Sequence, residues 1–234
     1  MKPILIPLGI LSITCAPAFA ADVDNDQADR PAYKDGWATG GDGSTSPASL
    51  GEWVLGDNAT DPNIAIASSG GLGSGKSGID TGGVAFRLLD PTNGDVDVFR
   101  FIDPMGLETG ETLSIDIAVN FRGRYKGIDA RDNSDATVFN FNIGADDYVV
   151  DKAATGNGSI GNTYDTRTVF TIAFKQETNT EGTWTIARSG GIIATATGNY
   201  SGRIRRLKIY NGGQDAEPEN ALYFNKLRVL PASK

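Results

Sequence analysis

Several stretches of this sequence carry residue types at spacings that could do chemistry, and the most regular is a glycine-rich loop. Residues Gly70–Ser77 read GGLGSGKS and fit the phosphate-loop pattern G-x-x-x-x-G-K-[ST] at every fixed position. A working phosphate loop follows a buried parallel strand and opens a helix. The residues after Ser77 read GIDTGG, which cannot begin a helix. We therefore expect an accidental match and no bound nucleotide.

Two acidic stretches offer the oxygen ligands that calcium prefers. Calcium takes six to eight oxygens, and neither stretch has the Gly and closing Glu of an EF-hand. The side chains concerned are Asp90, Asn93, Asp95 and Asp97 in DPTNGDVD, and Asp22, Asp24, Asp26 and Asp29 in DVDNDQAD. Asp and Asn are also ordinary turn residues. A structural calcium ion is one interpretation, favoured at the first stretch because it joins two expected strands; plain turns are the other.

Only one pair of carboxylates in the sequence is a candidate for catalysis, and its spacing is unfavourable. Glycoside hydrolysis needs two carboxylates about 5 to 10 Å apart, facing the scissile bond. Glu111 and Asp116 are the nearest pair, but residues an odd number apart point to opposite faces of a strand. A polysaccharide lyase could use Tyr with Arg or Lys, and residues 200–210, YSGRIRRLKIY, offer both. Basic residues on a strand more often form a solvated face, so we favour a non-enzymatic role.

Carbohydrate binding asks for amides, carboxylates and an aromatic plate, and three expected strands supply them. Their polar positions alternate with apolar ones in TLSIDIAVNF, VFNFNI and RRLKIY. If the three strands are neighbours in one sheet, their polar sides line a shared surface; otherwise they only keep the sheet soluble. The candidate glycan-binding residues are Asp116, Asn120, Asn140, Asn142 and Tyr210, with Tyr125 as a second plate.

The N-terminal sequence is typical of a secretory signal peptide. Lys2 precedes an apolar run, and Ala18-Phe19-Ala20 is a small-x-small cleavage site. The run is too short to span a bilayer, and no later segment has the roughly 20 apolar residues that a span needs. Cys15, the only cysteine, lies within this leader, and the chain has no histidine. The mature protein therefore has no disulfide, no thiol nucleophile and no His or Cys metal ligand.

The charge of the mature chain excludes some partners. Removal of Lys2 with the leader leaves 20 Lys and Arg against 29 Asp and Glu, a net charge of −9. Such a chain is repelled by nucleic acid and by anionic membrane surfaces. We expect a secreted protein, extracellular or periplasmic or associated with the cell surface, with no nucleic-acid partner and no transmembrane segment after cleavage.

Short apolar segments separated by Gly, Asn, Asp and Pro predict an all-β fold. No window of helical length carries an apolar stripe at 3.6-residue spacing. The alternation in TLSIDIAVNF places Leu113, Ile115, Ile117, Val119 and Phe121 on a packed face. The expected strands are Gly51–Leu55, Asn63–Ala67, Val84–Leu89, Val96–Ile102, Thr112–Phe121, Thr137–Ile143, Tyr148–Asp151, Thr168–Lys175, Thr183–Arg188, Ile192–Thr197, Ile204–Tyr210 and Ala221–Leu230.

The expected organisation is one sandwich domain preceded by an arm. Residues 1–20 form the signal peptide, 21–50 an N-terminal arm that enters the sandwich near Trp37 and Trp53, and 51–234 the β-sandwich. The mature length suits one such domain and is short for two. Trp37, Trp53 and Trp184 each lie beside strand-patterned apolar residues, so we expect all three in the core.

The arm and three later segments carry a spaced set of glycine, aromatic and acidic residues. They are Tyr33, Asp35, Gly36, Trp37, Gly40, Asp42, Gly43, Gly51 and Trp53; then Ile79–Gly83 and Phe86; then Gly110, Ser114 and Asp116; and finally Tyr223–Val229. This set resembles a family of secreted bacterial domains with a concanavalin A-like jelly-roll fold. The family opening reads Y-x-D-G-W-x-x-G-D-N-G-G…G-x-W, and its later parts read I-D-T-G-G-x-x-F, G-x-x-x-S-x-D and F-F-N-N-L-x-V.

The resemblance covers nearly the whole mature chain and implies an exported jelly-roll sandwich of about a dozen antiparallel strands. Many such domains carry a PEP-CTERM-type sorting tail, whereas this sequence ends LRVLPASK without one. Jelly rolls serve as lectins, hydrolases and structural modules alike. Our leading hypothesis is a non-catalytic, lectin-like module that binds an extracellular polysaccharide or cell-surface glycan. A purely structural or adhesive domain is the first alternative, and a glycoside hydrolase or polysaccharide lyase is the second.

Overall fold

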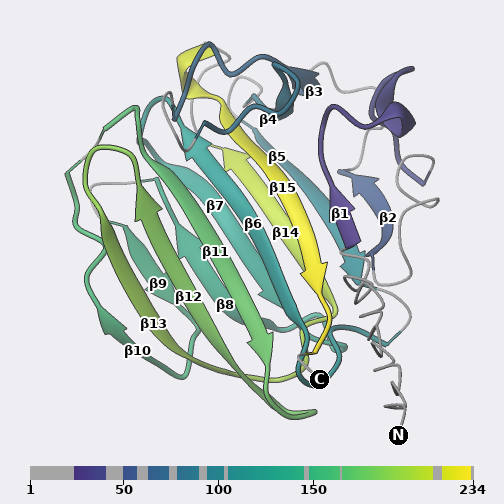
Figure 1. The fold of residues 1–234 in the computed structure, drawn as a ribbon, viewed down its shortest axis with the longest axis vertical. Coiled ribbons are helices and arrows are strands. Elements are labelled where there is room, and N and C mark those ends of the chain that lie inside the picture. Colours follow the sequence, from purple (N-terminus) through teal and green to yellow (C-terminus); the bar gives the residue numbers. More distant parts are fainter. Residues whose placement is uncertain are drawn as a thin grey trace, which may run out of the picture.

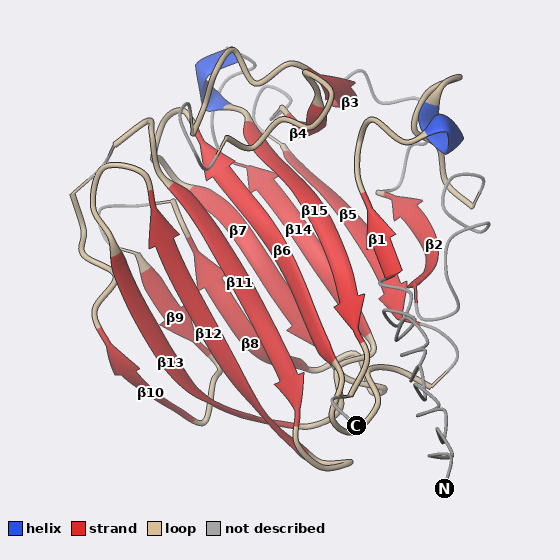
Figure 2. Cartoon of the chain, in the orientation of Figure 1, coloured by secondary structure: helices blue, strands red, loops and turns tan. Residues whose placement is uncertain are grey.

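Two antiparallel sheets packed face to face make up the described part of the chain (Figure 1; Figure 2). The leader expected at residues 1–20 lies outside it. The computed structural model describes residues 24–40, 50–56, 63–73, 78–89, 94–102, 105–144, 148–163, 165–212 and 218–232.

The front layer in Figure 1 is a nine-stranded sheet in the order β10-β13-β12-β11-β6-β15-β4-β3. The short strand β1 pairs with Leu227–Val229 of β15, further along that strand than the residues paired with β4. All of its pairings are antiparallel. Its strands are β1 (Asp24–Asp26), β3 (Ile64–Ala67), β4 (Ala85–Leu88), β6 (Thr112–Val119), β10 (Thr155–Gly158), β11 (Val169–Gln176), β12 (Glu181–Ser189), β13 (Ala194–Ser201) and β15 (Leu222–Leu230).

The rear layer is a six-stranded antiparallel sheet in the order β2-β5-β14-β7-β8-β9. Its strands are β2 (Leu50–Leu55), β5 (Asp95–Ile102), β7 (Tyr125–Arg131), β8 (Thr137–Asn142), β9 (Val149–Asp151) and β14 (Arg206–Gly212). Two short 3-10 helices, η1 (Pro31–Tyr33) and η2 (Pro218–Asn220), complete the described elements. The expectation of an all-β, jelly-roll-type sandwich is confirmed. Among the described residues no helix is long and apolar enough to cross a membrane.

Alternating side chains fill the space between the sheets. On β6 the side chains of Leu113, Ile115, Ile117 and Val119 are at most 4% exposed, as the sequence pattern predicts. Phe121 departs from the prediction and is 48% exposed, because β6 ends at Val119.

The two layers interlock through aromatic rings. Phe139 of β8 in the rear sheet packs edge-on against Phe174 of the front sheet, with ring centroids 4.9 Å apart, and lies 5.4 Å from Trp184. Phe141, two residues further along β8, contacts Phe170 at 5.2 Å in the same way. Burial of such rings supplies much of the hydrophobic stabilisation of a domain. Trp37, Trp53 and Trp184 are 8%, 0% and 2% exposed, which confirms them as core residues.

Five aromatic residues of the sequence motifs form one cluster at an end of the sandwich. Trp37 contacts Trp53 at a centroid distance of 5.1 Å and Phe86 at 4.7 Å, and Phe86 stacks on Phe224 at 5.2 Å. Tyr33 closes the group by an edge contact with Phe86. In this structure these positions therefore join the N-terminal segment to both sheets, which is a structural role.

Two buried polar side chains fasten the same end. The carboxylate of Asp26 accepts hydrogen bonds from the Tyr33 hydroxyl at 2.6 Å and the Trp53 indole at 3.0 Å, and it pairs with Arg100 at 3.2 Å. Burial, together with the nearby Asp26 carboxylate, raises the pKa of Tyr33 far above its usual range, so the phenol stays protonated and donates. Asn225, fully buried at a bulge in β15, binds the N-terminal segment and the loop before β4.

Part of the outer side of the nine-stranded sheet is covered. Leu72 and Ile79, from the loops before β4, form a second buried apolar cluster with outward-facing residues such as Ala118 and Tyr223. TLSIDIAVNF therefore does not have a fully wet face, since Ser114 and Ala118 are 4% and 0% exposed. The outer side of the six-stranded sheet is where polar strand positions come together.

Candidate functional site

The candidate site is the outer side of the six-stranded sheet, which we call the polar face. Its members are the outward side chains of β5, β14, β7 and β8, which alternate with the buried residues of the same strands. The register places Asp97, Tyr210, Gly127 and Asn142 in one row, and Phe99, Lys208, Asp129 and Asn140 in the next.

Three strands contribute to a hydrogen-bond network at the centre of the polar face. The Asn140 amide donates to the Asp129 carboxylate and to the Tyr210 hydroxyl, both at 2.7 Å. The other oxygen of Asp129 accepts from Arg131 at 3.1 Å. Asn140 thus links Asp129 and Tyr210 across three strands, and Arg131 holds Asp129 from the same strand, so the polar atoms are fixed before any ligand arrives. Such preorganisation reduces the entropy lost on binding.

Gly127 and the burial of Tyr210 shape this network. A Cβ atom at position 127 would lie 2.8 Å from the Tyr210 hydroxyl and 2.0 Å from the carbonyl oxygen of Phe141, so only glycine fits here. Burial raises the pKa of Tyr210 to about 12, although the hydrogen bond from Asn140 acts in the opposite direction. The Tyr210 hydroxyl is therefore neutral at physiological pH.

The cations of the polar face are matched by carboxylates. Lys208 pairs with Asp97 at 2.5 Å, and Arg131 pairs with Asp135 at 3.1 Å as well as with Asp129. Arg206 also contacts Asp135 and lies over the rings of Phe99 and Phe101, with its guanidinium carbon 4.8 Å and 5.5 Å from their centroids. The faces of these two rings are thus occupied by a cation.

Two exposed apolar side chains flank the network. Tyr125, two residues before Gly127 on β7, is 62% exposed, and Val149 on β9, opposite Asn142, is 44% exposed. Together they place open apolar surface beside the amides and carboxylates of the polar face. Tyr125 is thus the open aromatic plate, since Tyr210 is largely buried and has its hydroxyl engaged by Asn140.

The structure divides the five glycan-binding candidates between the two sheets. Asn140, Asn142 and Tyr210 lie together on the polar face, with Asn142 accepting a hydrogen bond from the backbone of Gly144. Asp116 and Asn120 do not join them, because β6 belongs to the nine-stranded sheet. Asp116 is bound to Thr171 at 2.6 Å and to Lys226 at 3.2 Å. The three strands are not neighbours in one sheet, so the five residues do not line a single surface.

Sequence reasoning missed the strand at the centre of the site. β7 (Tyr125–Arg131) supplies Gly127, Asp129 and Arg131, yet it was not among the expected strands. Its inward positions include Lys126, whose ammonium group donates to the carbonyl oxygen of Phe121, so the apolar alternation is broken. In YKGIDAR the odd-numbered positions hold Tyr125, Gly127, Asp129 and Arg131, and Ile128 and Ala130 lie between them. This alternation was the signal that could have predicted the strand.

The carboxylate pair considered for hydrolysis has other partners. Glu111 accepts a hydrogen bond from the backbone of Glu108, before β6 begins, and Asp116 is bound to Thr171 and Lys226. The loop Gly70–Ser77 is described only as far as Gly73. The strand before it, β3, pairs antiparallel with β4, and β4 is the next strand after it. This order differs from the strand–loop–helix arrangement of a phosphate loop.

The acidic stretches are only partly described. Asp90, Asn93 and Asp22 lie outside the described residues, as does the side chain of Asp24. Asp95 is exposed and Asp97 is paired with Lys208, whereas Asp26 and Asp29 bind Tyr33 and Thr81 respectively. Within the described ranges no three Asp or Glu side chains are grouped as metal ligands.

Comparison with known proteins gives fold matches alone. No protein-family model matches the chain, and no curated protein matches its sequence. Solved structures with a similar fold include an alginate lyase of polysaccharide lyase family 7, at 14% identity and a TM-score of 0.40, covering 65% of this chain and 80% of that one. A cleaved adhesin domain of Lys-gingipain from Porphyromonas gingivalis is 13% identical, with a TM-score of 0.37, covering 88% and 97%. These similarities are too low to assign a function.

Proposed function

We propose that this protein is an exported, non-catalytic module that binds a glycan on the polar face. One observation carries the proposal: a fixed network of Tyr210, Asn140, Asp129 and Arg131 lies on the same side of the sheet as the open ring of Tyr125. Sugar rings present hydroxyl groups at their edges and C–H bonds on their faces. Amide and carboxylate groups suit the edges, and an exposed aromatic ring suits a face.

Each group on the polar face has a distinct role in this proposal. Asn142 accepts hydrogen bonds from sugar hydroxyls, and Tyr125 packs against one sugar ring. Asp129, which is only 8% exposed, holds the Asn140 amide in place. Gly127 leaves room for the Tyr210 hydroxyl to lie against the sheet and reach Asn140. Strands hold all of these positions, so the site is more rigid than one built on loops.

The charges of the face favour a neutral or weakly charged glycan over a strong polyanion. Lys208, Arg131 and Arg206 are each engaged by Asp97, Asp129 or Asp135. A polyanion would have to displace these carboxylates and would approach a protein whose mature net charge is −9. The glycan would be extracellular, because we also propose export by way of the leader at residues 1–20.

The two alternatives differ in what they require of the same residues. A purely structural or adhesive domain needs no ligand at the network. A lyase would need Tyr210 as base with a cation to neutralise a uronate. With its pKa raised to about 12, the Tyr210 hydroxyl is a poor base near neutral pH. The non-catalytic proposal therefore stands ahead of the enzymatic one. A structural calcium ion at Asp90–Asp97 remains part of the proposal, independent of the glycan site.

A glycan array with two variants tests the function. We expect the wild type to bind a restricted set of glycans and the Asn140→Ala/Asn142→Ala variant to lose that binding. Asn179→Ala, an amide deletion on the exposed β11–β12 turn, is the control and should bind normally. A flat array for the wild type would favour the structural alternative. Release of reducing or unsaturated ends from a bound polysaccharide would instead establish an enzyme.

A further inference from the structure

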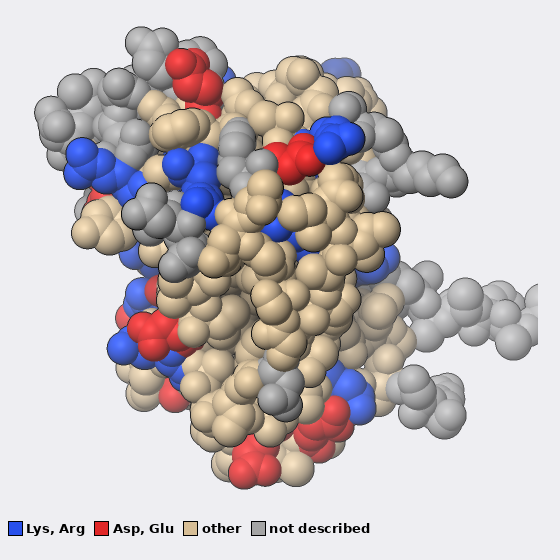
Figure 3. Space-filling view, turned by 90° about the vertical axis from the view of Figure 1, so that its left-hand side faces the viewer, with Lys and Arg blue, Asp and Glu red and all other residues tan. Residues whose placement is uncertain are grey.

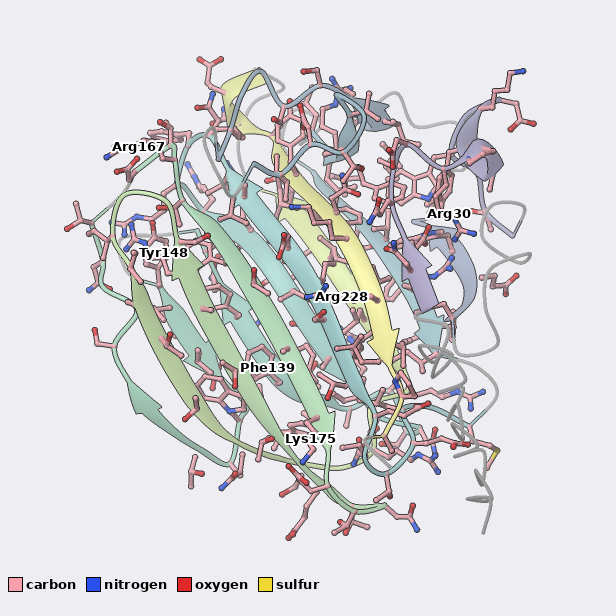
Figure 4. All side chains as sticks on the ribbon, viewed as in Figure 1. Arg30, Phe139, Tyr148, Arg167, Lys175 and Arg228 are labelled. Carbon is pink, nitrogen blue, oxygen red and sulfur yellow. The ribbon has the colours of Figure 1, made fainter. Side chains whose placement is uncertain are left out.

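A second concave site opens at the edge of the sandwich, away from the polar face. It is a pocket of about 370 Å³ between β9 of one sheet and β10, β12 and β13 of the other. Tyr148 forms part of its wall and lies beside β13, on the side of the molecule far from β1 and β2 (Figure 4). The volume is at the small end of the roughly 300 to 1,000 Å³ of ligand pockets, which suits one ring better than a long chain.

The sequence of β10 creates the space. Residues 155–158 read TGNG, and Gly156 lies so close to the indole of Trp184 that a Cβ atom there would be 2.6 Å from the ring. The indole donates to the carbonyl oxygen of Thr155 at 3.2 Å. At Gly158, φ is +92° and a Cβ atom would meet the carbonyl oxygen of Thr195 at 2.6 Å. Because both positions are glycine, no side chain from residue 156 or 158 fills the space beside the Trp184 ring.

The opposite wall is held in place by two arginines. Arg188, 1% exposed, donates to the carbonyl oxygens of Ile160 at 3.0 Å and of Gly161 at 3.1 Å. Arg122 donates to the carbonyl oxygen of Asn162 at 2.5 Å. The guanidinium carbons of these arginines lie 5.2 Å and 5.1 Å from the ring centroid of Tyr148. The pocket is therefore built before a ligand binds, which favours affinity.

The lining is uncharged but rich in hydrogen-bonding groups. Of the described residues around the pocket, none is Lys, Arg, Asp or Glu. Thr155, Ser159 and Asn162 supply polar side chains, and Val150 and Trp184 supply apolar contact. Figure 3 views the molecule from this side and shows a broad area with few charged side chains. Arg122 and Arg188 lie behind Tyr148 and donate to backbone carbonyl oxygens, so a carboxylate in the pocket would lose hydration without forming a direct ion pair.

We propose that this pocket binds a single neutral sugar ring, such as the end group of a glycan chain. The strand β9 connects the pocket to the polar face, because Val149 lies opposite Asn142 while the next residue, Val150, lines the pocket. A glycan lying across the polar face toward β9 would reach this edge. The choice of a sugar as ligand rests on the proposed function, whereas the binding of a small neutral polyol does not.

The test is a fluorine NMR titration of protein labelled with 5-fluorotryptophan. The chain has three tryptophans, and Trp184→Phe identifies the signal of the one that lines the pocket. The probes are glucose, galactose, mannose and N-acetylglucosamine, each alone, together with glucuronate and galacturonate. We expect at least one neutral sugar to shift the Trp184 signal without moving the other two. The matching uronate should bind at least about tenfold more weakly, because its carboxylate loses hydration without forming a direct ion pair.

Two variants separate this inference from the proposed function. Ser159→Tyr places a ring at the mouth of the pocket and should abolish the shift, whereas Asn179→Tyr adds the same ring on the exposed β11–β12 turn and should not. The Asn140→Ala/Asn142→Ala variant should keep the Trp184 response even where glycan-array binding is lost. A Trp184 signal that no neutral sugar moves, a uronate that binds as tightly, or a response that disappears with the Asn140 and Asn142 amides would each overturn the proposal.

Discussion

Replacement of Asp26 by asparagine tests the reading of the N-terminal segment as part of the folded core. The Asp26 carboxylate is 0% exposed and receives Tyr33, Trp53 and Arg100, and Arg100 is itself 0% exposed. Asp26→Asn keeps the shape but leaves the buried guanidinium of Arg100 without its carboxylate. Breaking a buried ion pair from one side costs about 3 to 5 kcal/mol.

The expected shift follows from the size of the domain. For a domain of this length each kcal/mol lowers Tm by about 2 to 4 °C, so we expect a drop of roughly 6 to 20 °C. Urea denaturation of the mature protein gives the free energy of unfolding, and a thermal scan gives Tm. Asp151→Asn, which removes one partner of the exposed pair with Lys152, is the control and should change little.

A second variant makes the reasoning refutable. In Asp26→Leu/Arg100→Met both charges are absent, and Tyr33 and Trp53 can keep their mutual hydrogen bond of 3.0 Å. We expect this double variant to recover at least about 2 kcal/mol relative to Asp26→Asn, because an apolar pair can replace a buried ion pair at little cost. Loss of less than about 1 kcal/mol in Asp26→Asn, or no recovery in the double variant, would contradict a buried pair at this position.

Three further outcomes follow from the structure. Asn225→Ala should lose at least about 2 kcal/mol in urea denaturation, because Ala28 and Val84 then lack their buried side-chain partner; a neutral change would refute the role of Asn225. Since the pKa of Tyr210 is about 12 in the folded protein, against about 10 unfolded, stability should fall as pH rises from about 10 to 12, and Tyr210→Phe should flatten that fall; an unchanged slope would argue against burial of the hydroxyl. Calcium should raise Tm of the wild type more than that of Asp95→Asn, and equal shifts would exclude Asp95 as a ligand.

Local alternation was enough to predict the fold class and part of the site. β6 and β8 keep large apolar residues on one side, so Leu113 and Phe139 could be assigned to the core from the sequence. Asn140 and Tyr210 were assigned to polar strand positions by the same rule. Their meeting depends on a strand between them, and β7 was not visible because Lys126 occupies an inward position and Gly127 has no side chain.

The roles of Asp116 and Asp26 depend on contacts with residues distant in the sequence. Asp116 alternates like the polar-face residues, but its strand pairs with β11 and β15 and so belongs to the other sheet. Asp26 has the composition of a calcium loop around it, yet its carboxylate is buried against Arg100, a residue distant in sequence. In both cases the side chain's role depends on a partner strand, which a single sequence does not reveal.

The most direct test of the glycan-binding proposal is an NMR titration of the side-chain amides with the best ligand from the array. We predict that the signals of Asn140 and Asn142 shift in a saturable manner, while that of Asn120 on the other side of the sandwich stays in place. Tyr125→Ala should weaken the same titration by about tenfold, since an aromatic contact is worth about 0.5 to 1.5 kcal/mol beyond its buried area. Saturable shifts at Asn120 with none at Asn140 and Asn142 would contradict the assignment of the polar face.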